Sequence, residues 1–120
     1  MSIAELHAKL IAHGLTLPEA WEDHPWGETA IKVRKKIFLF IGLGETLTLG
    51  VKLPFSGEAM LALPCAKPMA YGLGRHGWVS LTLTAEDLQR EALSELKLQA
   101  LVDESFRAVA PKTLGKQVPI

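Results

Sequence analysis

Three short runs of β-branched and aromatic residues follow one another in the first half of the chain, and they constrain its fold more than any other feature. Thr29 to Val33, Ile37 to Leu43 and Thr46 to Leu53 have the length and composition of strands. They are separated only by Arg34-Lys35-Lys36 and by Gly44-Glu45. Because such short connections join antiparallel neighbours, these residues predict an antiparallel meander of three strands.

A fourth strand is predicted from Trp78 to Leu83. Its other apolar residues occupy every second position and alternate with Trp78, Ser80 and Thr82, a pattern typical of a sheet with one covered face. The run from Ile37 to Leu43 differs, because it is apolar at both sets of alternating positions. That run is therefore predicted to be the buried central strand.

A first helix is predicted near the amino terminus. Ser2 and Glu5 have the spacing of a capping box, and apolar residues then recur on one helical face from residue 3 to residue 13. Gly14 is predicted to end this helix in a left-handed conformation, which costs glycine little because it has no Cβ.

Prolines mark the predicted loops. The segment from Leu17 to Gly27 contains two prolines and is predicted to be a loop, with Trp21 and Trp26 as anchors on the core. Pro68 is predicted to keep the segment before the glycine-rich residues of the seventies out of a helix.

The remaining helices are predicted after the third and fourth strands. Ser56 is expected to cap a short helix that continues through Leu63 and stops at Pro64. Thr84 is expected to cap a helical region that extends to the end of the chain, with a break near Ser94.

The predicted element order is therefore αβββαβαα. Clustered strands with helices at the ends indicate an α+β fold, in which helices cover one face of an antiparallel sheet. With 120 residues, of which 48% are hydrophobic, the chain can build one compact core, so residues 1–120 are predicted to form a single domain. The expected core residues are Ile31, Val33, Phe38, Phe40, Leu49, Val51, Trp78, Val79, Leu81, Phe106 and Val109.

Charge is balanced overall but not along the chain. Thirteen Lys and Arg residues face 13 Asp and Glu residues, which excludes a polyanion-binding tail and an acidic disordered protein. Residues 27–76 nevertheless carry a net charge of +4, because they hold seven cations and three acids. The centre of the chain is thus its basic part.

The sequence also predicts a cytoplasmic protein without a membrane partner. No apolar run approaches the roughly 18 to 20 residues that cross a bilayer, and the amino-terminal segment lacks the pattern of a signal peptide. Cys65 is the only cysteine, so no internal disulfide can form, which fits a reducing compartment.

Several segments together resemble the MmcQ/YjbR family over roughly residues 17 to 112. In order, they are Pro18, Pro25-Trp26-Gly27, Lys36-Ile37-Phe38, Val51-Lys52-Leu53, Tyr71-Gly72-Leu73-Gly74-Arg75-His76-Gly77-Trp78-Val79 and Glu104-Ser105-Phe106-Arg107. The resemblance implies a CyaY-like or secretion-chaperone-like α+β fold and a double-wing DNA-binding role. One departure is Phe106, where the family often has tyrosine, so a phenolic hydroxyl is missing here.

Two basic loops are the candidate nucleic-acid contacts. Arg34, Lys35 and Lys36 form a cationic turn between two predicted strands, and Arg75 with His76 forms the tip of the glycine-rich loop. Cations on such tips can reach phosphates, as the wings of a DNA-binding domain do. The alternative is a solvated hairpin turn, in which lysine prevents edge-to-edge strand pairing. If both loops emerge on one side, they form a two-pronged cationic surface.

The glycine loop also matches the dinucleotide-binding spacing GxGxxG, through Gly72, Gly74 and Gly77. A true fingerprint follows a strand and opens a helix, because the helix amino terminus receives the pyrophosphate. Here a loop with Pro68 precedes the glycines and a predicted strand follows them. We therefore interpret the glycines as shaping a turn, with Arg75 exposed at its apex.

Two further groups could carry chemistry. Glu22, Asp23 and His24 offer oxygen and imidazole ligands, but adjacent loop residues do not converge on a metal without further ligands, so a solvated acidic loop is the better interpretation. Cys65 lies in an apolar run between Pro64 and Ala66, which predicts a buried, unreactive thiol.

Two functional classes remain. The first is a nucleic-acid-binding module, with DNA as the partner of the two basic loops. The second is a protein-interaction or chaperone-like module that uses a sheet edge or a helix groove. An enzyme is not expected, because no acid–base pair can be placed, and neither catalytic residues, metal nor cofactor are predicted.

Overall fold

An antiparallel sheet of six strands forms the centre of the computed structural model, which describes residues 1–119. The spatial order of the strands is β1-β2-β3-β4-β6-β5, and each neighbouring pair is antiparallel. The strands are β1 (Ala20–Asp23), β2 (Thr29–Val33), β3 (Lys36–Leu43), β4 (Leu47–Lys52), β5 (Ala66–Pro68) and β6 (Trp78–Leu83). The predicted meander is β2-β3-β4, and β3 is central as expected.

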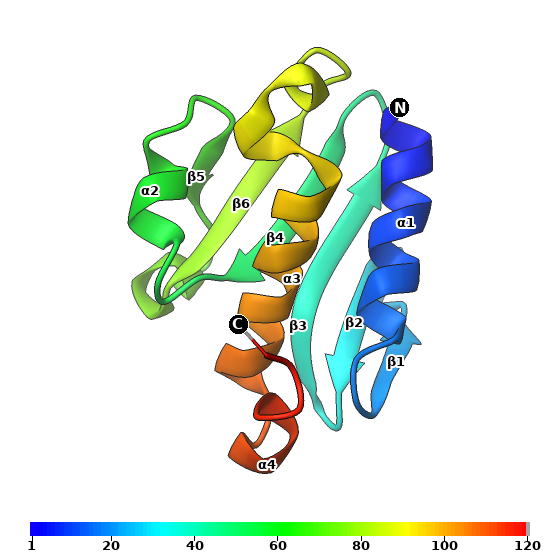
Figure 1. The fold of residues 1–120 in the computed structure, drawn as a ribbon, viewed down its shortest axis with the longest axis vertical. Helices are drawn as coiled ribbons and strands as arrows, with labels where there is room; N and C mark the ends of the chain where they lie inside the picture. Colours follow the sequence, from blue (N-terminus) through cyan, green and yellow to red (C-terminus); the bar gives the residue numbers. More distant parts are fainter. Residues whose placement is uncertain (120) are drawn as a thin grey trace.

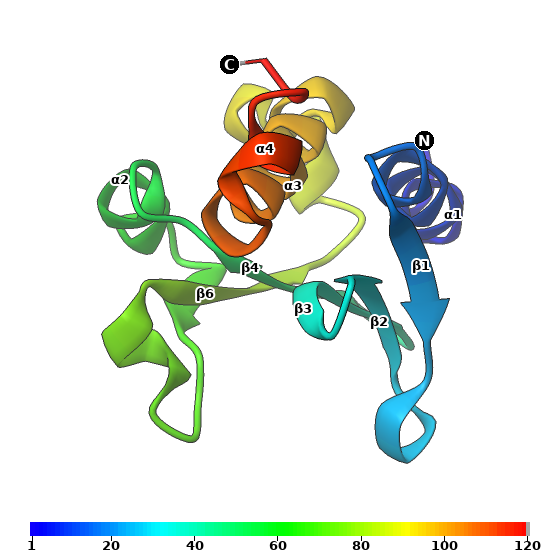
Figure 2. The same cartoon turned by 90° about the horizontal axis from the view of Figure 1, so that it is seen from below.

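Helices cover one face of this sheet (Figures 1 and 2). The α-helices are α1 (Ile3–Leu15), α2 (Gly57–Leu61), α3 (Glu95–Val109) and α4 (Lys112–Gly115). Short 3₁₀ helices are η1 (Pro25–Gly27), η2 (Leu73–His76), η3 (Asp87–Gln89) and η4 (Glu91–Leu93). Helices α1 and α3 pack on the same side of the sheet, while α2 lies beside β5 and β6. The α+β class is confirmed.

The core lies between the sheet and these two helices. The rings of Phe38 on β3 and Phe106 on α3 meet edge to face, with centroids 5.1 Å apart, and both side chains are fully buried. Such aromatic pairs add to the free energy gained by burying their area. Nine of the eleven expected core residues are buried, whereas Phe40 and Val109 are only half-buried.

Two short strands were not predicted, β1 and β5. Each lies at an edge of the sheet and pairs with one neighbour only, β2 or β6. Pro68 is tolerated in β5 because an edge strand does not need every backbone N–H for its ladder. Neither strand shows a clear period of two, so pairing with the neighbouring strand, and not the local pattern, produces them.

Trp21 was predicted to anchor its loop on the core, and this prediction was wrong. Its side chain is 44% exposed, and its indole N–H donates to the carbonyl of Arg34 at 2.8 Å. The ammonium of Lys32 lies 5.2 Å from the ring centroid, a cation–π arrangement. The same prediction for Trp26 falls on a side chain that lies outside the described part of the structure.

The prediction for Gly14 was also wrong. Helix α1 continues to Leu15, and Gly14 lies buried in its last turn, where a Cβ would be 3.7 Å from side-chain atoms of Ile31 and Leu39. Thr16 is the C-cap residue, and its backbone N–H donates to the carbonyls of the last turn. Glycine at this position therefore serves close packing of α1 on the sheet. Within residues 1–119, no helix has the length and apolarity to cross a membrane.

Candidate nucleic-acid interface

Strands β3 and β4 separate at one end, and Ser105 of α3 fills the gap between them. Their pairing extends from Leu43 and Leu47 to Phe40 and Gly50, and stops there. Beyond that point the backbone N–H of Lys52 donates to the Ser105 hydroxyl oxygen at 2.8 Å. The same hydroxyl donates to the carbonyl of Phe38 at 2.5 Å. Figure 1 shows α3 lying over this separation. One side chain thus replaces a rung of the ladder and holds the strands apart.

Glu104, the neighbour of Ser105, anchors the segment that follows β4. Its carboxylate accepts backbone N–H groups of Phe55 and Ser56, both at 3.0 Å, and the Ser56 hydroxyl at 2.6 Å. The side chain of Ser56 therefore does not cap α2, contrary to prediction, because it donates to Glu104 instead. A buried carboxylate is costly unless it is hydrogen-bonded, and these three bonds meet that requirement.

A cleft of about 390 Å³ opens where the strands separate. Its lining residues are Lys35, Lys36, Ile37, Phe40, Lys52, Leu73, Trp78, Ala108 and Val109. Three of these residues are lysines, and the others are apolar or aromatic. The rings of Phe40 and Trp78 meet at a centroid distance of 5.5 Å and an interplanar angle of 65°. The cleft therefore combines cationic side chains with an apolar floor.

The glycine-rich loop forms one wall of this cleft. It folds as η2 between Gly72 and Gly77, whose φ angles of 80° and 87° lie in the left-handed region that favours glycine. A Cβ at Gly74 would lie 2.7 Å from the Cβ of Pro68, so a side chain there would collide with β5. These constraints place Leu73 in the cleft lining. Figure 2 shows the loop on the sheet face opposite the helices.

The structure brings part of the predicted site together. Lys35 and Lys36 from the hairpin turn, with Leu73 from the glycine loop, border the same cleft. Arg75 and His76 are exposed on η2 but lie outside the cleft lining. The Arg75 guanidinium lies over Gly72, where a Cβ would be 3.3 Å from its Nη2.

Arg34 is positioned differently from the two lysines that follow it. It has a φ of 55°, and its guanidinium contacts Glu19, with Nε and Oε1 3.3 Å apart. Sequence reasoning did not identify Lys52 as a site residue, although it belongs to the Val51-Lys52-Leu53 segment of the family resemblance. Lys52 enters the cleft because β4 has separated from β3 at this point.

Further cations lie at the same end of the molecule. The β2–β3 turn, the carboxyl end of α3 and α4 gather there, as the end-on view of Figure 2 shows. Helix α4 begins at Lys112 and is followed by Lys116, and both are exposed. The opposite end holds η3, η4 and the start of α3, which carry the acids Glu86, Asp87, Glu91 and Glu95. Two of these acids are paired with cations, Asp87 with Arg90 and Glu95 with Lys9.

A known family model covers almost the whole of this cleft. The family model described as YjbR matches residues 15–108. This chain belongs to the YjbR family. The match confirms the family resemblance and includes every cleft residue except Val109. No curated protein matches the chain.

The two carboxylates of β1 in this YjbR-family chain, Glu22 and Asp23, both have cationic or imidazole partners. Asp23 contacts the Lys32 ammonium at 2.7 Å, and this hydrogen bond lowers the pKa of the Asp23 carboxyl. Glu22 Oε2 lies 2.9 Å from Nε2 of His24. Within residues 1–119, no group of three or more His, Cys, Asp or Glu side chains is placed to hold a metal ion.

Cys65 is half-buried and packs against the core of the YjbR domain, whereas the sequence predicted full burial. Burial raises the pKa of its thiol, and the charge of Asp87 acts in the same direction. Because the thiolate is the reactive form, both effects reduce its reactivity.

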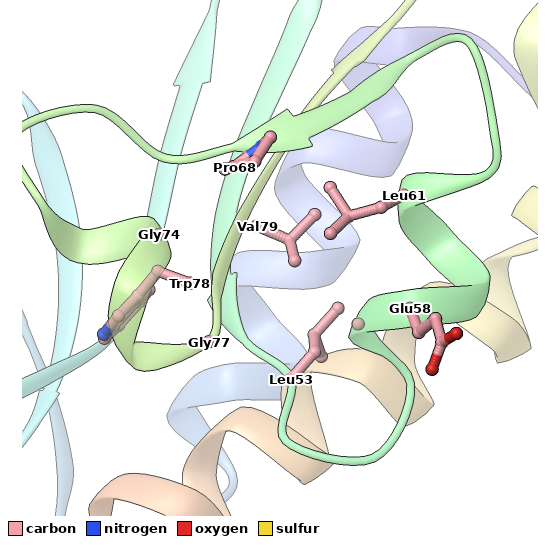
Figure 3. Close-up of a pocket in the computed structure, with 9 residues that line it drawn as sticks. Leu53, Glu58, Leu61, Pro68, Gly74, Gly77, Trp78 and Val79 are labelled. Atoms are coloured by element: carbon pink, nitrogen blue, oxygen red, sulfur yellow. The ribbon is translucent and has the colours of Figure 1, made fainter.

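A second, apolar pocket of about 280 Å³ lies between α2, β5 and η2. Figure 3 shows Leu61 of α2 opposite Val79 of β6, with Leu53 below them and Glu58 at the rim. Trp78 lines both this pocket and the basic cleft. The Trp78 side chain is thus shared between the two sites.

Proposed function

We propose that this YjbR-family chain is a non-catalytic DNA-binding module and that the basic cleft is its contact surface. One observation carries the proposal: Lys35 and Lys36, at the start of β3, and Lys52, at the end of β4, line one cleft where the two strands separate. Each lysine offers three N–H donors on a flexible stem, which suits phosphate oxygens. Arg75, on the neighbouring η2, extends the cationic surface.

Arg34 contributes less than the lysines in this proposal. Its partner Glu19 already neutralises its charge, although both side chains are more than half exposed. An exposed ion pair of this kind is worth less than about 1 kcal/mol, and a phosphate that contacts Arg34 must offset that amount to displace Glu19. His76 is exposed beside Arg75 and adds positive charge only when it is protonated.

The proposed binding has little sequence selectivity. Phosphate contacts position a protein on DNA but do not read base edges. With three or four phosphates neutralised, the logarithm of affinity should fall against the logarithm of salt concentration with a slope of about −3 to −4.

The test is a fluorescence-anisotropy titration of labelled duplex DNA at several salt concentrations. Wild type is compared with a variant in which Lys35, Lys36 and Lys52 are replaced by alanine. The matched control replaces the same number of cations outside the cleft by alanine, namely Lys67, Arg90 and Lys97. We expect only the cleft variant to lose affinity and to have a flatter salt slope. Equal losses in both variants, or no binding by wild type at low salt to either the duplex or a single strand of the same length, would refute the proposal.

The apolar pocket beside α2 supports a second candidate function, a protein-interaction module. Leu61 lines this pocket and is 40% exposed, and nearby in sequence Phe55 is 86% exposed. Exposed apolar side chains next to a pocket are typical of protein-binding surfaces. Failure of the DNA titration would make this pocket the better candidate site.

A further inference from the structure

The floor of the basic cleft is apolar, which phosphate binding alone does not require. Ile37, Phe40 and Trp78 line it together with Val109 of α3, while the lysines supply the charge. Contact with such side chains does not favour the binding of phosphate oxygens, because these oxygens would lose hydrogen bonds to water without gaining new ones. A ligand that matches the whole cleft must therefore carry an apolar, planar or aliphatic part close to its negative charge.

We propose that the cleft binds single-stranded nucleic acid by taking in one unpaired base, while Lys35, Lys36 and Lys52 contact the flanking phosphates. This inference rests on the proposed function and names its ligand more narrowly. A nucleotide carries a flat base and an anionic phosphate close together. The apolar and aromatic lining of the cleft matches the base, and its lysines match the phosphate.

The size of the cleft favours a single base over a duplex. Its volume of about 390 Å³ lies within the range of pockets that hold small ligands, about 300 to 1,000 Å³. In a duplex, each base is paired and stacked, so its faces are not available to Phe40 or Trp78. An unpaired base has a free face and needs no extrusion from a helix.

The surrounding structure holds the floor in place before a ligand arrives. Ser105 keeps β3 and β4 apart through bonds to Lys52 and Phe38. Phe40 is fixed by its contact with Trp78, which is itself almost fully buried. Rigid aromatic side chains lose little conformational freedom on binding, which strengthens the contact with a base.

The test uses three labelled probes of equal length: oligo-dT, an abasic strand with the same phosphates, and a duplex. Anisotropy titrations compare wild type with Phe40→Leu, which keeps apolar volume but removes the ring. We expect wild type to bind oligo-dT about tenfold more tightly than the abasic strand, and Phe40→Leu to remove most of that difference. The salt slope and the affinity for the abasic strand should stay unchanged in Phe40→Leu, because the lysines remain.

The outcomes separate this inference from the function on which it rests. If oligo-dT, abasic strand and duplex all bind equally well, the base-binding inference fails while DNA binding stands. If none binds, both fail. A glutamate-rich peptide with one tyrosine that bound as tightly as oligo-dT would overturn the assignment to nucleic acid. Ile37→Thr, on the same floor, replaces Phe40→Leu if that variant does not fold, and should also weaken oligo-dT selectively.

Discussion

Replacing Glu104 by alanine should destabilise the fold strongly, because this one carboxylate anchors the segment between β4 and α2. Only 7% of Glu104 is exposed, and the substitution removes hydrogen bonds from two backbone N–H groups and from the Ser56 hydroxyl. A hydrogen bond to a charged group contributes about 1.5 to 3 kcal/mol, and an unsatisfied buried donor costs a similar amount. Water can reach part of this segment, because Phe55 is exposed, so we expect a total loss of about 2 to 4 kcal/mol.

Two matched variants sharpen this prediction. Glu104→Gln can keep one acceptor oxygen for both backbone N–H groups, but it loses the charge and replaces the oxygen that accepts the Ser56 hydroxyl by an NH2 group. It should therefore cost about 1 to 2 kcal/mol. Glu58→Ala removes an exposed glutamate from α2 and should change stability by less than about 0.5 kcal/mol. We expect Glu104→Ala to be the most destabilising variant, Glu104→Gln the next, and Glu58→Ala the least.

The assay is urea unfolding followed by circular dichroism, with unchanged m-values as the sign that two-state unfolding is preserved. In a thermal melt, about 3 kcal/mol should lower the Tm by roughly 10 °C for a chain of this length. A Glu104→Ala protein as stable as wild type would refute the reasoning, because the three hydrogen bonds would then contribute nothing net. Combining Glu104→Ala with Ser56→Ala should give less than the sum of the single losses, since both remove the same bond.

The remaining predictions concern the core and the thiol. Phe38→Ala should cost about 3 to 5 kcal/mol, since it empties a fully buried site opposite Phe106; a thermal melt unchanged by it would contradict the placement of β3. Native Cys65 should react slowly with a thiol reagent at neutral pH and faster as the pH rises, because its raised pKa keeps it protonated; labelling as fast as in the unfolded chain would contradict this. The neutral thiol's contribution to stability is present below the unfolded-state pKa and is lost as the pH rises through the higher folded-state pKa. Cys65→Ala should leave nucleic-acid binding unchanged.

Local sequence patterns were sufficient to predict the central elements of the fold. Strands β2 and β6 begin and end at the predicted residues, and Ser94 is the N-cap of α3, at the predicted helix break. These elements have strong signals of their own, such as β-branched runs between charged turns and a hydroxyl that caps a helix. Edge strands lack such signals, which explains why β1 and β5 were not predicted.

The candidate site was only partly predictable. The charges of Lys35 and Lys36 at a hairpin tip can be read from sequence, and so can the glycines that shape η2. Ser105 shares a helical face with Leu98, Leu101 and Val102, and a polar residue in such an apolar stripe is a signal of a buried hydrogen bond. Its partners on β3 and β4 are more than 50 residues away in the chain, so no local pattern could name them.

By itself, the sequence determined which segments form the central strands and the main helices, that helices cover one face of the sheet, and where cations stand at the loop tips. Those properties depend on periodicity, turn chemistry and charge within a few residues. Tertiary structure alone decided that Lys52 joins Lys35 and Lys36 around one cleft, and that Arg34 is neutralised by Glu19. The reason is physical: both results depend on contacts between distant residues, and above all on the Ser105 hydroxyl, which holds two strands apart at one point of the sheet.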